Sequence, residues 1–166
     1  MKKTLIMLVM AVLLMAGGRV FAQEHEYVDL GLPSGTLWAT CNVGADKPEG
    51  FGDYSAWGNE WSAPTKEQWE ELQEHTTNTW TTQNGVNGLL FTASNGQSLF
   101  LPAAGYRMND KVEYVGSDGK YWSSSPYTDY PDLVWSFYFD SINYGTDLYE
   151  KTCGFTVRLV RSTRQK

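Results

Sequence analysis

The residues between Pro126 and Tyr149 are of types that bind ligands through surface side chains. Tyrosine offers a large contact area with a polar tip and little rotamer entropy to lose, and Asp and Asn add adaptable hydrogen bonds. The predicted ligand-binding residues are Tyr127, Asp129, Tyr130, Asp132, Tyr138, Asn143, Tyr144, Asp147 and Tyr149. An aromatic and polar β-sheet surface without any ligand would have the same composition. Both interpretations stay open.

Residues for catalysis are sparse. His25 and His75 have no obvious triad partner nearby in the sequence, so lone surface histidines are the better interpretation. Ser123, Ser124 and Ser125 stand outside any G-x-S-x-G motif, and we expect them to satisfy backbone groups where a strand opens into a loop. The sequence therefore predicts no catalytic residue, no metal site and no cofactor, and the chain is not expected to be an enzyme.

Two cysteines, Cys41 and Cys153, are the remaining reactive groups. Neither has a second Cys or a His at the spacing of a zinc site. An oxidising compartment would permit a disulfide between them, whereas cysteines in apolar runs are commonly just buried. A disulfide and two buried thiols both stay open.

The N-terminal segment predicts export. Two lysines precede an apolar run at 5–15, and Val20-Phe21-Ala22 has the small-x-Ala ending of a signal peptide at 1–22. About 20 apolar residues are needed to span a bilayer, and this run is shorter, so no membrane span is expected once the signal is removed. The protein is expected to be periplasmic, at the cell surface or secreted.

Residues 23–166 are enough for a single domain and too few for two well-buried cores. The signal segment holds three of the 13 basic residues and none of the 19 acidic ones, so the remainder has a formal charge of −9. This charge repels phosphate backbones, and no nucleic-acid partner is expected. The expected partner is a protein or glycan ligand outside the cytoplasm.

Thr65 and Gln68 have the spacing of a capping box, which predicts a short helix that starts at Lys66 and ends near His75. Elsewhere, short apolar or alternating runs between Gly, Asn, Asp and Pro predict mainly antiparallel β structure. One hairpin should turn at Asn95-Gly96, a pair suited to positive φ angles.

Alternating residues predict three further strands. One strand should carry Leu37, Ala39, Cys41 and Val43 on one face. The apolar faces of the other two should meet in one core behind the helix, and they consist of Trp135, Phe137 and Phe139, and of Phe155, Val157 and Leu159. The intervening residues Ser136 and Tyr138 should form a polar outer face.

Six runs in this order resemble a known family: YVDLGLPSGTLWATCNVGA, WSAPTKEQWEEL, WTTQNGVNG, LFLPAAGYR, GKYWSSSPY and GFTVRLVR. Together they resemble the Fibrobacter succinogenes major paralogous domain, which is abundant in exported Bacteroidetes proteins. The resemblance implies an α+β, C-type-lectin-like fold that is mainly antiparallel β with one clear helix. That fold is distantly similar to the formylglycine-generating enzyme and to the variable proteins of diversity-generating retroelements.

The chain departs from this family in one place. Relatives carry a longer insert with a first helix between Gly58 and Trp61, where only Asn59 and Glu60 stand here, so this helix is expected to be missing. The enzyme would imply a copper-binding cysteine pair, which neither cysteine matches. The variable proteins alter residues in a region that corresponds to the one between Trp122 and Gly154.

Three functions follow from this sequence. The first is an exported, non-enzymatic recognition module whose C-terminal region binds a protein or glycan ligand, with or without diversification. The second is a structural or accessory domain of the cell envelope without a dedicated ligand. The third is a degenerate relative of the formylglycine-generating type of enzyme.

Overall fold

The computed structural model describes residues 25–58 and 62–163, and the predicted signal peptide lies outside these ranges. In chain order the elements are β1 (Tyr27–Asp29), β2 (Thr36–Asn42), α1 (Lys66–His75), β3 (Thr76–Gln83), β4 (Val86–Ala93), β5 (Ser98–Pro102), β6 (Tyr106–Met108), β7 (Lys111–Glu113), β8 (Gly119–Pro126), β9 (Leu133–Phe139), β10 (Tyr144–Glu150) and β11 (Arg158–Ser162). The described residues thus form one helix among many strands, which confirms the α+β, mainly β prediction.

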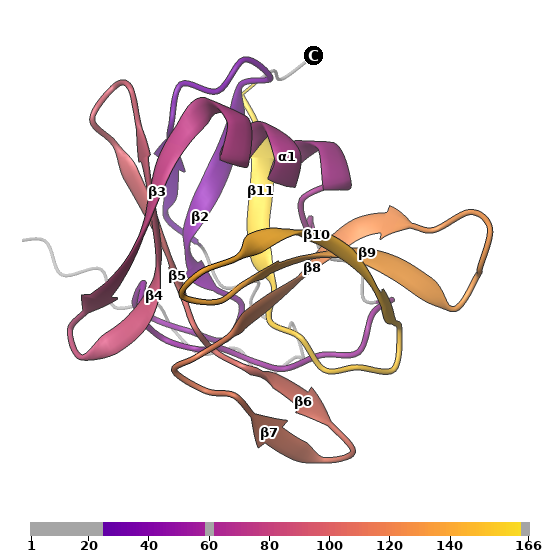
Figure 1. Cartoon of the computed structure of the whole chain (residues 1–166). Coiled ribbons are helices and arrows are strands. Elements are labelled where there is room, and N and C mark those ends of the chain that lie inside the picture. The colour runs from indigo at the N-terminus through magenta and orange to yellow at the C-terminus, as the bar shows by residue number, and fades with distance from the viewer. Residues whose placement is uncertain (1–24, 59–61, 164–166) are drawn as a thin grey trace, which may run out of the picture.

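The strands form three small antiparallel sheets, in the orders β1-β2-β11, β3-β4-β5 and β10-β9-β8, together with the hairpin β6-β7. Helix α1 lies across one end of the sheets, and the β6-β7 hairpin projects from the opposite end (Figure 1). The last strand, β11, pairs with β2 and so returns the chain to its first sheet. Among the described helical segments, none has the length and apolar character of a membrane span.

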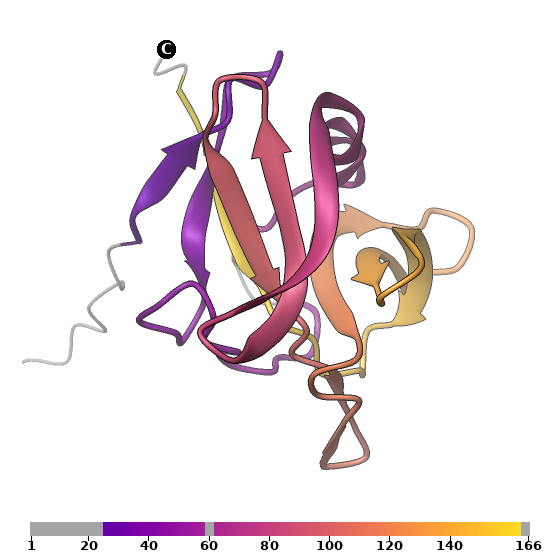
Figure 2. The same ribbon diagram turned by 60° about the vertical axis from the view of Figure 1, so that its left-hand side comes forward.

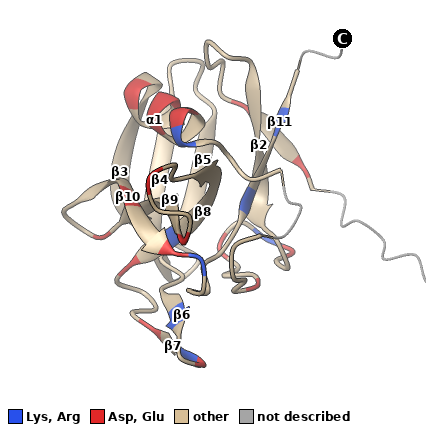
Figure 3. Cartoon of the chain, turned by 90° about the vertical axis from the view of Figure 1, so that its right-hand side faces the viewer, with Lys and Arg blue, Asp and Glu red and all other residues tan. Residues whose placement is uncertain are grey.

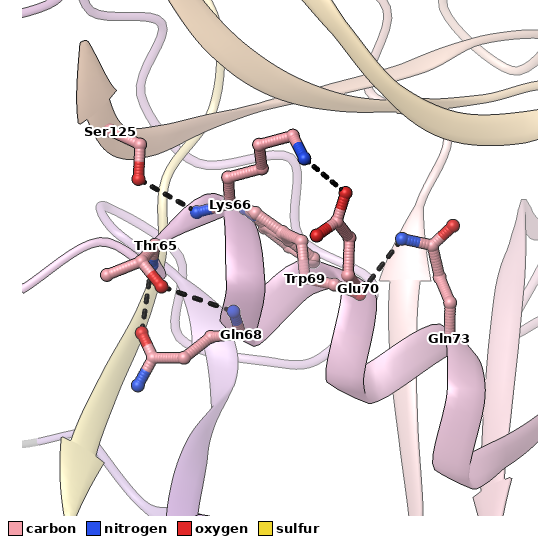
Figure 4. Close-up of polar contacts among 7 residues, drawn as sticks. All are labelled: Thr65, Lys66, Gln68, Trp69, Glu70, Gln73 and Ser125. Carbon is pink, nitrogen blue, oxygen red and sulfur yellow. Dashed lines mark hydrogen bonds and ion pairs between the residues drawn. The ribbon is translucent and has the colours of Figure 1, made fainter.

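Helix α1 begins at the predicted capping box (Figure 4). The amide of Gln68 donates to Thr65 Oγ1 at 3.2 Å, and the amide of Thr65 donates to Gln68 Oε1 at 2.8 Å. The amide of Lys66 donates to the Ser125 hydroxyl at 2.9 Å. Free amides at a helix start need such acceptors. The cap is therefore built from the helix itself and from the end of β8.

The predicted hairpin is also confirmed, because β4 and β5 pair across a turn in which Gly96 has φ +84°. A second tight turn joins β3 to β4, where both Asn84 and Gly85 have positive φ values, of 47° and 83°. Two positive φ angles define the hairpin turn that best matches strand twist. The residues of these two turns therefore favour the antiparallel pairing of β3 with β4 and of β4 with β5.

The main core brings the three sheets together under α1. The Trp69 ring of the helix stacks on Phe137 of β9, with centroids 4.7 Å apart and an interplanar angle of 11°. Trp38 of β2 lies 4.8 Å from Trp69, and Phe91 of β4 lies 6.1 Å from Phe137. All four rings are buried. Such aromatic pairs stabilise the fold beyond the burial of their area. These four rings therefore join the helix to each of the three sheets.

A second cluster lies on the other face of the β10-β9-β8 sheet. It contains Phe155 and Val157 packed on Trp122 and Val134. The prediction that the Phe155 and Phe137 faces meet in one core is therefore wrong. Neighbouring residues of a strand point to opposite faces, and both faces of β8 and β9 are covered. For the same reason, Ser136 is buried and does not lie on a polar outer face.

Arg158 in β11 is fully buried between the sheets. Its Nε donates to Asn42 Oδ1 at 2.9 Å, and Nη1 donates to the carbonyls of Ala39 and Thr40 at 3.0 and 2.7 Å. Its Nη2 donates to the Phe100 carbonyl at 3.0 Å. Burial lowers the pKa of this guanidinium. This one side chain thus joins β11 to β2 and β5.

Candidate functional site

The nine predicted ligand-binding residues do not form one surface. Six are exposed, namely Asp129, Tyr130, Asp132, Asn143, Tyr144 and Asp147. The other three, Tyr127, Tyr138 and Tyr149, are half-buried. They divide among the β8–β9 connection, the β9–β10 turn and one face of the β10-β9-β8 sheet. We describe each place separately.

An aromatic ledge, defined here as Tyr127, Tyr130 and Trp135, lies where β8 passes into β9. The rings of Tyr127 and Tyr130 lie 6.1 Å apart and are nearly parallel, at 13°. Trp135 meets Tyr127 edge to face at 5.9 Å. Tyr130 remains 64% exposed. The sequence predicted both tyrosines at a binding surface but assigned Trp135 to the core.

Two backbone hydrogen bonds hold this connection in shape. The amide of Tyr127 donates to the carbonyl of Leu133, and the amide of Leu133 donates to the carbonyl of Tyr130, both at 3.0 Å. These bonds close the loop on itself between the ends of two paired strands. The tyrosine rings therefore project from a fixed support, and the connection extends beyond the body of the fold (Figure 1).

The start of α1 supports the ledge from the side. Lys66 Nζ lies 4.7 Å from the centroid of the Trp135 ring and 2.5 Å from Glu70 Oε1 (Figure 4). A cation over an indole face is favourable, and a carboxylate four residues along a helix can fix its position. Only the Lys66–Glu70 spacing was visible in the sequence, and it did not show that Trp135 would lie beneath.

The ledge has an acidic border. A hydrogen bond to Asp129, together with its charge, raises the pKa of the Tyr127 phenol. The Asp132 side chain is exposed on the same connection. Acidic residues are spread over the surface of the described chain, with α1 contributing several (Figure 3). The ledge therefore offers flat aromatic surface beside hydrogen-bond acceptors, which favours a neutral ligand rich in hydroxyl groups over an anionic one.

A second aromatic group, the tyrosine cage, consists of Tyr106, Tyr138 and Tyr149 around the Lys120 ammonium. Lys120 Nζ lies 5.0, 5.9 and 3.9 Å from the three ring centroids, in that order. It also donates to the Tyr149 hydroxyl at 2.5 Å. Tyr138 and Tyr149 do not project outward as expected. Their strand face is covered by the second cluster, and their rings contact a lysine of the chain itself.

The pKa values of residues in the tyrosine cage are shifted. Burial, and then the charge of Asp147, raise the pKa of Tyr149 to about 12. Burial lowers the pKa of Lys120, against the opposing effects of Asp118 and Asp147. The Tyr149 phenol therefore keeps its proton at any physiological pH and remains a partner for the lysine.

This shift predicts a pH dependence for Tyr149→Phe. A folded-state pKa raised above the ordinary value of about 10 gives stability that is present below pH 10 and lost as the pH rises toward 12. The wild-type free energy of unfolding should therefore fall more steeply over this range than that of Tyr149→Phe, in urea titrations at stepwise pH. The exposed Tyr114→Phe should keep the wild-type slope. Equal slopes for wild type and Tyr149→Phe would contradict the prediction.

Asn143 lies in the β9–β10 turn and Tyr144 begins β10, at the opposite end of β9 from the ledge. Asp140 fixes this turn, because its Oδ1 accepts from the amides of Ile142 and Asn143 at 2.6 and 2.7 Å. These bonds lower the pKa of the Asp140 carboxyl. The predicted residues of this turn thus form a surface separate from the ledge.

The other candidate reactive groups have structural contacts. Cys41 and Cys153 are both free and half-buried, so the disulfide alternative is not formed. Burial raises the pKa of the Cys153 thiol. The Ser125 and Ser123 hydroxyls accept from the amides of Lys66 and Ser125, which confirms the expected role of these serines. Within 25–58 and 62–163, no three His, Cys, Asp or Glu side chains gather as metal ligands.

A family model described as "Domain of unknown function (DUF8237)" matches residues 75–160. The chain belongs to this family. The DUF8237 match runs from the end of α1 into β11 and includes the ledge and the tyrosine cage, whereas Lys66 lies before it. No curated protein and no solved structure matches the chain.

Proposed function

We propose that this DUF8237 protein is an exported, non-enzymatic recognition module that binds a glycan through the aromatic ledge. One observation carries the proposal. The Tyr127 and Tyr130 rings are nearly parallel and their loop is held by backbone hydrogen bonds, yet the Tyr130 ring remains exposed. Ordering the ligand-contacting side chains is a main cost of binding. Here much of that cost is met before the ligand arrives.

The shape and chemistry of the ledge favour a glycan over a protein ligand. One face of a pyranose ring carries C–H groups that lie flat on aromatic rings, and its hydroxyls can donate to carboxylates such as those of Asp129 and Asp132. A specific protein partner needs about 800 Å² on each side, whereas the ledge consists of three rings. Protein binding is the alternative outcome of the experiment below.

The remaining parts of the proposal rest on sequence. Export follows from residues 1–22, and the C-type-lectin-like fold and kinship with the Fibrobacter paralogous family follow from the six ordered runs. The antiparallel sheets and the single capped helix are compatible with that kinship. Adenine-rich codons at the Tyr and Asn positions beside a template repeat would support diversification of the C-terminal region.

The structural-domain alternative applies to part of the same region. Tyr138 and Tyr149 pack around Lys120 and so have a structural role without any ligand. Tyr130 has no comparable role, because its ring contacts only the other ledge tyrosine among the aromatic pairs of the described chain. Substitution of single tyrosines can therefore distinguish a structural role from a role in ligand recognition.

Tyr130→Ala is the variant that tests the proposal. The purified protein is applied to a glycan array, and the dissociation constant of the best-bound oligosaccharide is measured by titration. Truncating an anchor residue commonly costs about 2 kcal/mol, or about thirtyfold in Kd. Tyr130→Ala should show this loss while its melting temperature stays near that of the wild type.

Tyr114→Ala is the matched control, since Tyr114 is 54% exposed, also stacks on one tyrosine, and lies near the β6-β7 hairpin. It should bind as the wild type does. Equal losses in both variants, or an array without any ligand for the wild type, would overturn the glycan proposal. Capture of a surface protein through Tyr130 would instead establish the protein alternative.

A further inference from the structure

The sheet edges of this fold differ in how they are protected from pairing with another chain. An open edge presents unpaired amides and carbonyls, and proteins commonly protect it by short length, charge, proline or a bulge. Strand β1 has three residues. Strand β10 carries Asp147 and Glu150, and β8 and β11 each contain a register shift.

Strand β3 has none of these protections. Its eight residues, TTNTWTTQ, include no charge, proline or glycine. It pairs with β4 over eight consecutive positions without a shift. It is the outermost strand of its sheet (Figure 2). Within the described ranges, no backbone hydrogen bond joins its other edge to a further segment.

We propose that β3 pairs antiparallel with β3 of a second copy, which joins two three-stranded sheets into one of six strands. In a twofold dimer each copy presents the same surface. Opposed residues of an antiparallel pair point to the same side of the sheet. With the axis at Thr79, Thr77 lies opposite the partner's Thr81 on the outer face, and Asn78 lies opposite the partner's Trp80 on the core side.

This register matches chemistry across the axis. Cross-strand threonine pairs are favourable, and like charges directly opposite are unfavourable. Thr77 and Thr79 are exposed on the outer face, and Trp80 is half-buried against the main core. The proposed pairing therefore adds threonine contacts on one face and extends aromatic cover on the other.

The absence of charge on β3 allows a second copy of this acidic chain to pair at this edge. The chain has a net charge of −6, so two copies repel over most of their surfaces. Helix α1 contributes Glu67, Glu70, Glu71 and Glu74 to this acidic surface. The uncharged β3 is the long open edge at which two acidic molecules can approach with the least repulsion.

Sedimentation velocity from 1 to 100 µM tests the pairing with the purified wild-type protein and with Thr79→Lys. The wild type should form a concentration-dependent dimer. Thr79→Lys places two ammonium groups opposite each other at the axis and should raise the dimer dissociation constant at least tenfold. Thr92→Lys is the control, because Thr92 is exposed on the same face but lies on the central strand β4, and it should dimerise as the wild type does.

Cysteine cross-linking tests the register. In a Cys41→Ser, Cys153→Ser background, Thr79→Cys should form a disulfide-linked dimer under mild oxidation, because directly opposed Cβ atoms lie about 4.5–5.5 Å apart. Thr92→Cys should stay monomeric. A monomeric wild type across the concentration range, a dimer that Thr79→Lys leaves intact, or equal cross-linking at both positions would overturn the proposal. None of these outcomes depends on the glycan ledge.

Discussion

Phe137→Ala should lower the free energy of unfolding by about 3–5 kcal/mol, the usual cost of removing a buried phenylalanine ring. The ring is fully buried, stacks on Trp69 at 4.7 Å, and contacts Phe91 and Phe139 at 6.1 and 5.9 Å. Those contacts come from the helix and from two different sheets. The cavity would thus open where three layers meet, and none of them can close it alone.

Urea unfolding followed by tryptophan fluorescence measures this loss. Total stabilities of small domains are about 5–15 kcal/mol, so the variant should be close to unfolding at growth temperature. Ile142→Ala is the control from the same β9–β10 hairpin, since Ile142 is 84% exposed, and it should unfold close to the wild-type midpoint. A Phe137→Ala midpoint within the error of the Ile142→Ala midpoint would show that β9 is misassigned.

Local signals in the sequence predicted local structure well. The Thr65–Gln68 spacing predicted the start of α1, and Asn95-Gly96 predicted the β4–β5 hairpin, because caps and tight turns are decided within a few residues. Exposure of Tyr130 was also foreseen. These features need no knowledge of what the rest of the chain packs against.

Features that depend on distant partners were missed. In β2 the alternation predicted one apolar face that carries Leu37, Ala39, Cys41 and Val43. Ala39 and Val43 are buried, but Leu37 and Cys41 are only half-buried. On the opposite face Thr36, Trp38 and Asn42 are buried as well. The two polar residues can be buried because Gln68 donates to Thr36 and Arg158 donates to Asn42. Binary patterning treats such residues as surface residues, since their partners lie 32 and 116 positions away.

The same dependence on distant partners explains why the sequence did not separate the exposed tyrosines of the ledge from the packed tyrosines of the tyrosine cage. Whether a tyrosine on an alternating strand meets solvent or packs depends on what covers that face of the sheet. The β10-β9-β8 sheet is covered on both faces, so Tyr138 and Tyr149 pack around Lys120. Tyr127 and Tyr130 escape this cover because they lie in the β8–β9 connection, beyond the ends of the two strands.

Arg158→Met should lower the free energy of unfolding by about 3–5 kcal/mol, because it removes the donor of several buried hydrogen bonds at once. The side chain of methionine fills much of the space but donates no hydrogen bond. The carbonyls of Ala39, Thr40 and Phe100 would lose the donor described above. A buried acceptor left without a partner costs about 1–3 kcal/mol, and backbone carbonyls cannot be mutated away to compensate.

Arg158→Lys separates charge from geometry. Lysine keeps the positive charge, but its single ammonium cannot reproduce a planar group that reaches Asn42 of β2 and Phe100 of β5 together. It should therefore recover little of the stability lost in Arg158→Met. Arg161→Met is the control from the same strand, since Arg161 is exposed and lies over the Tyr27 ring at 4.2 Å, and it should cost less than about 1 kcal/mol. If Arg158→Lys unfolded at the wild-type midpoint, the positive charge alone would explain the contribution of Arg158 to stability. The hydrogen bonds to three backbone carbonyls of β2 and β5 would then not be what holds the sheets together.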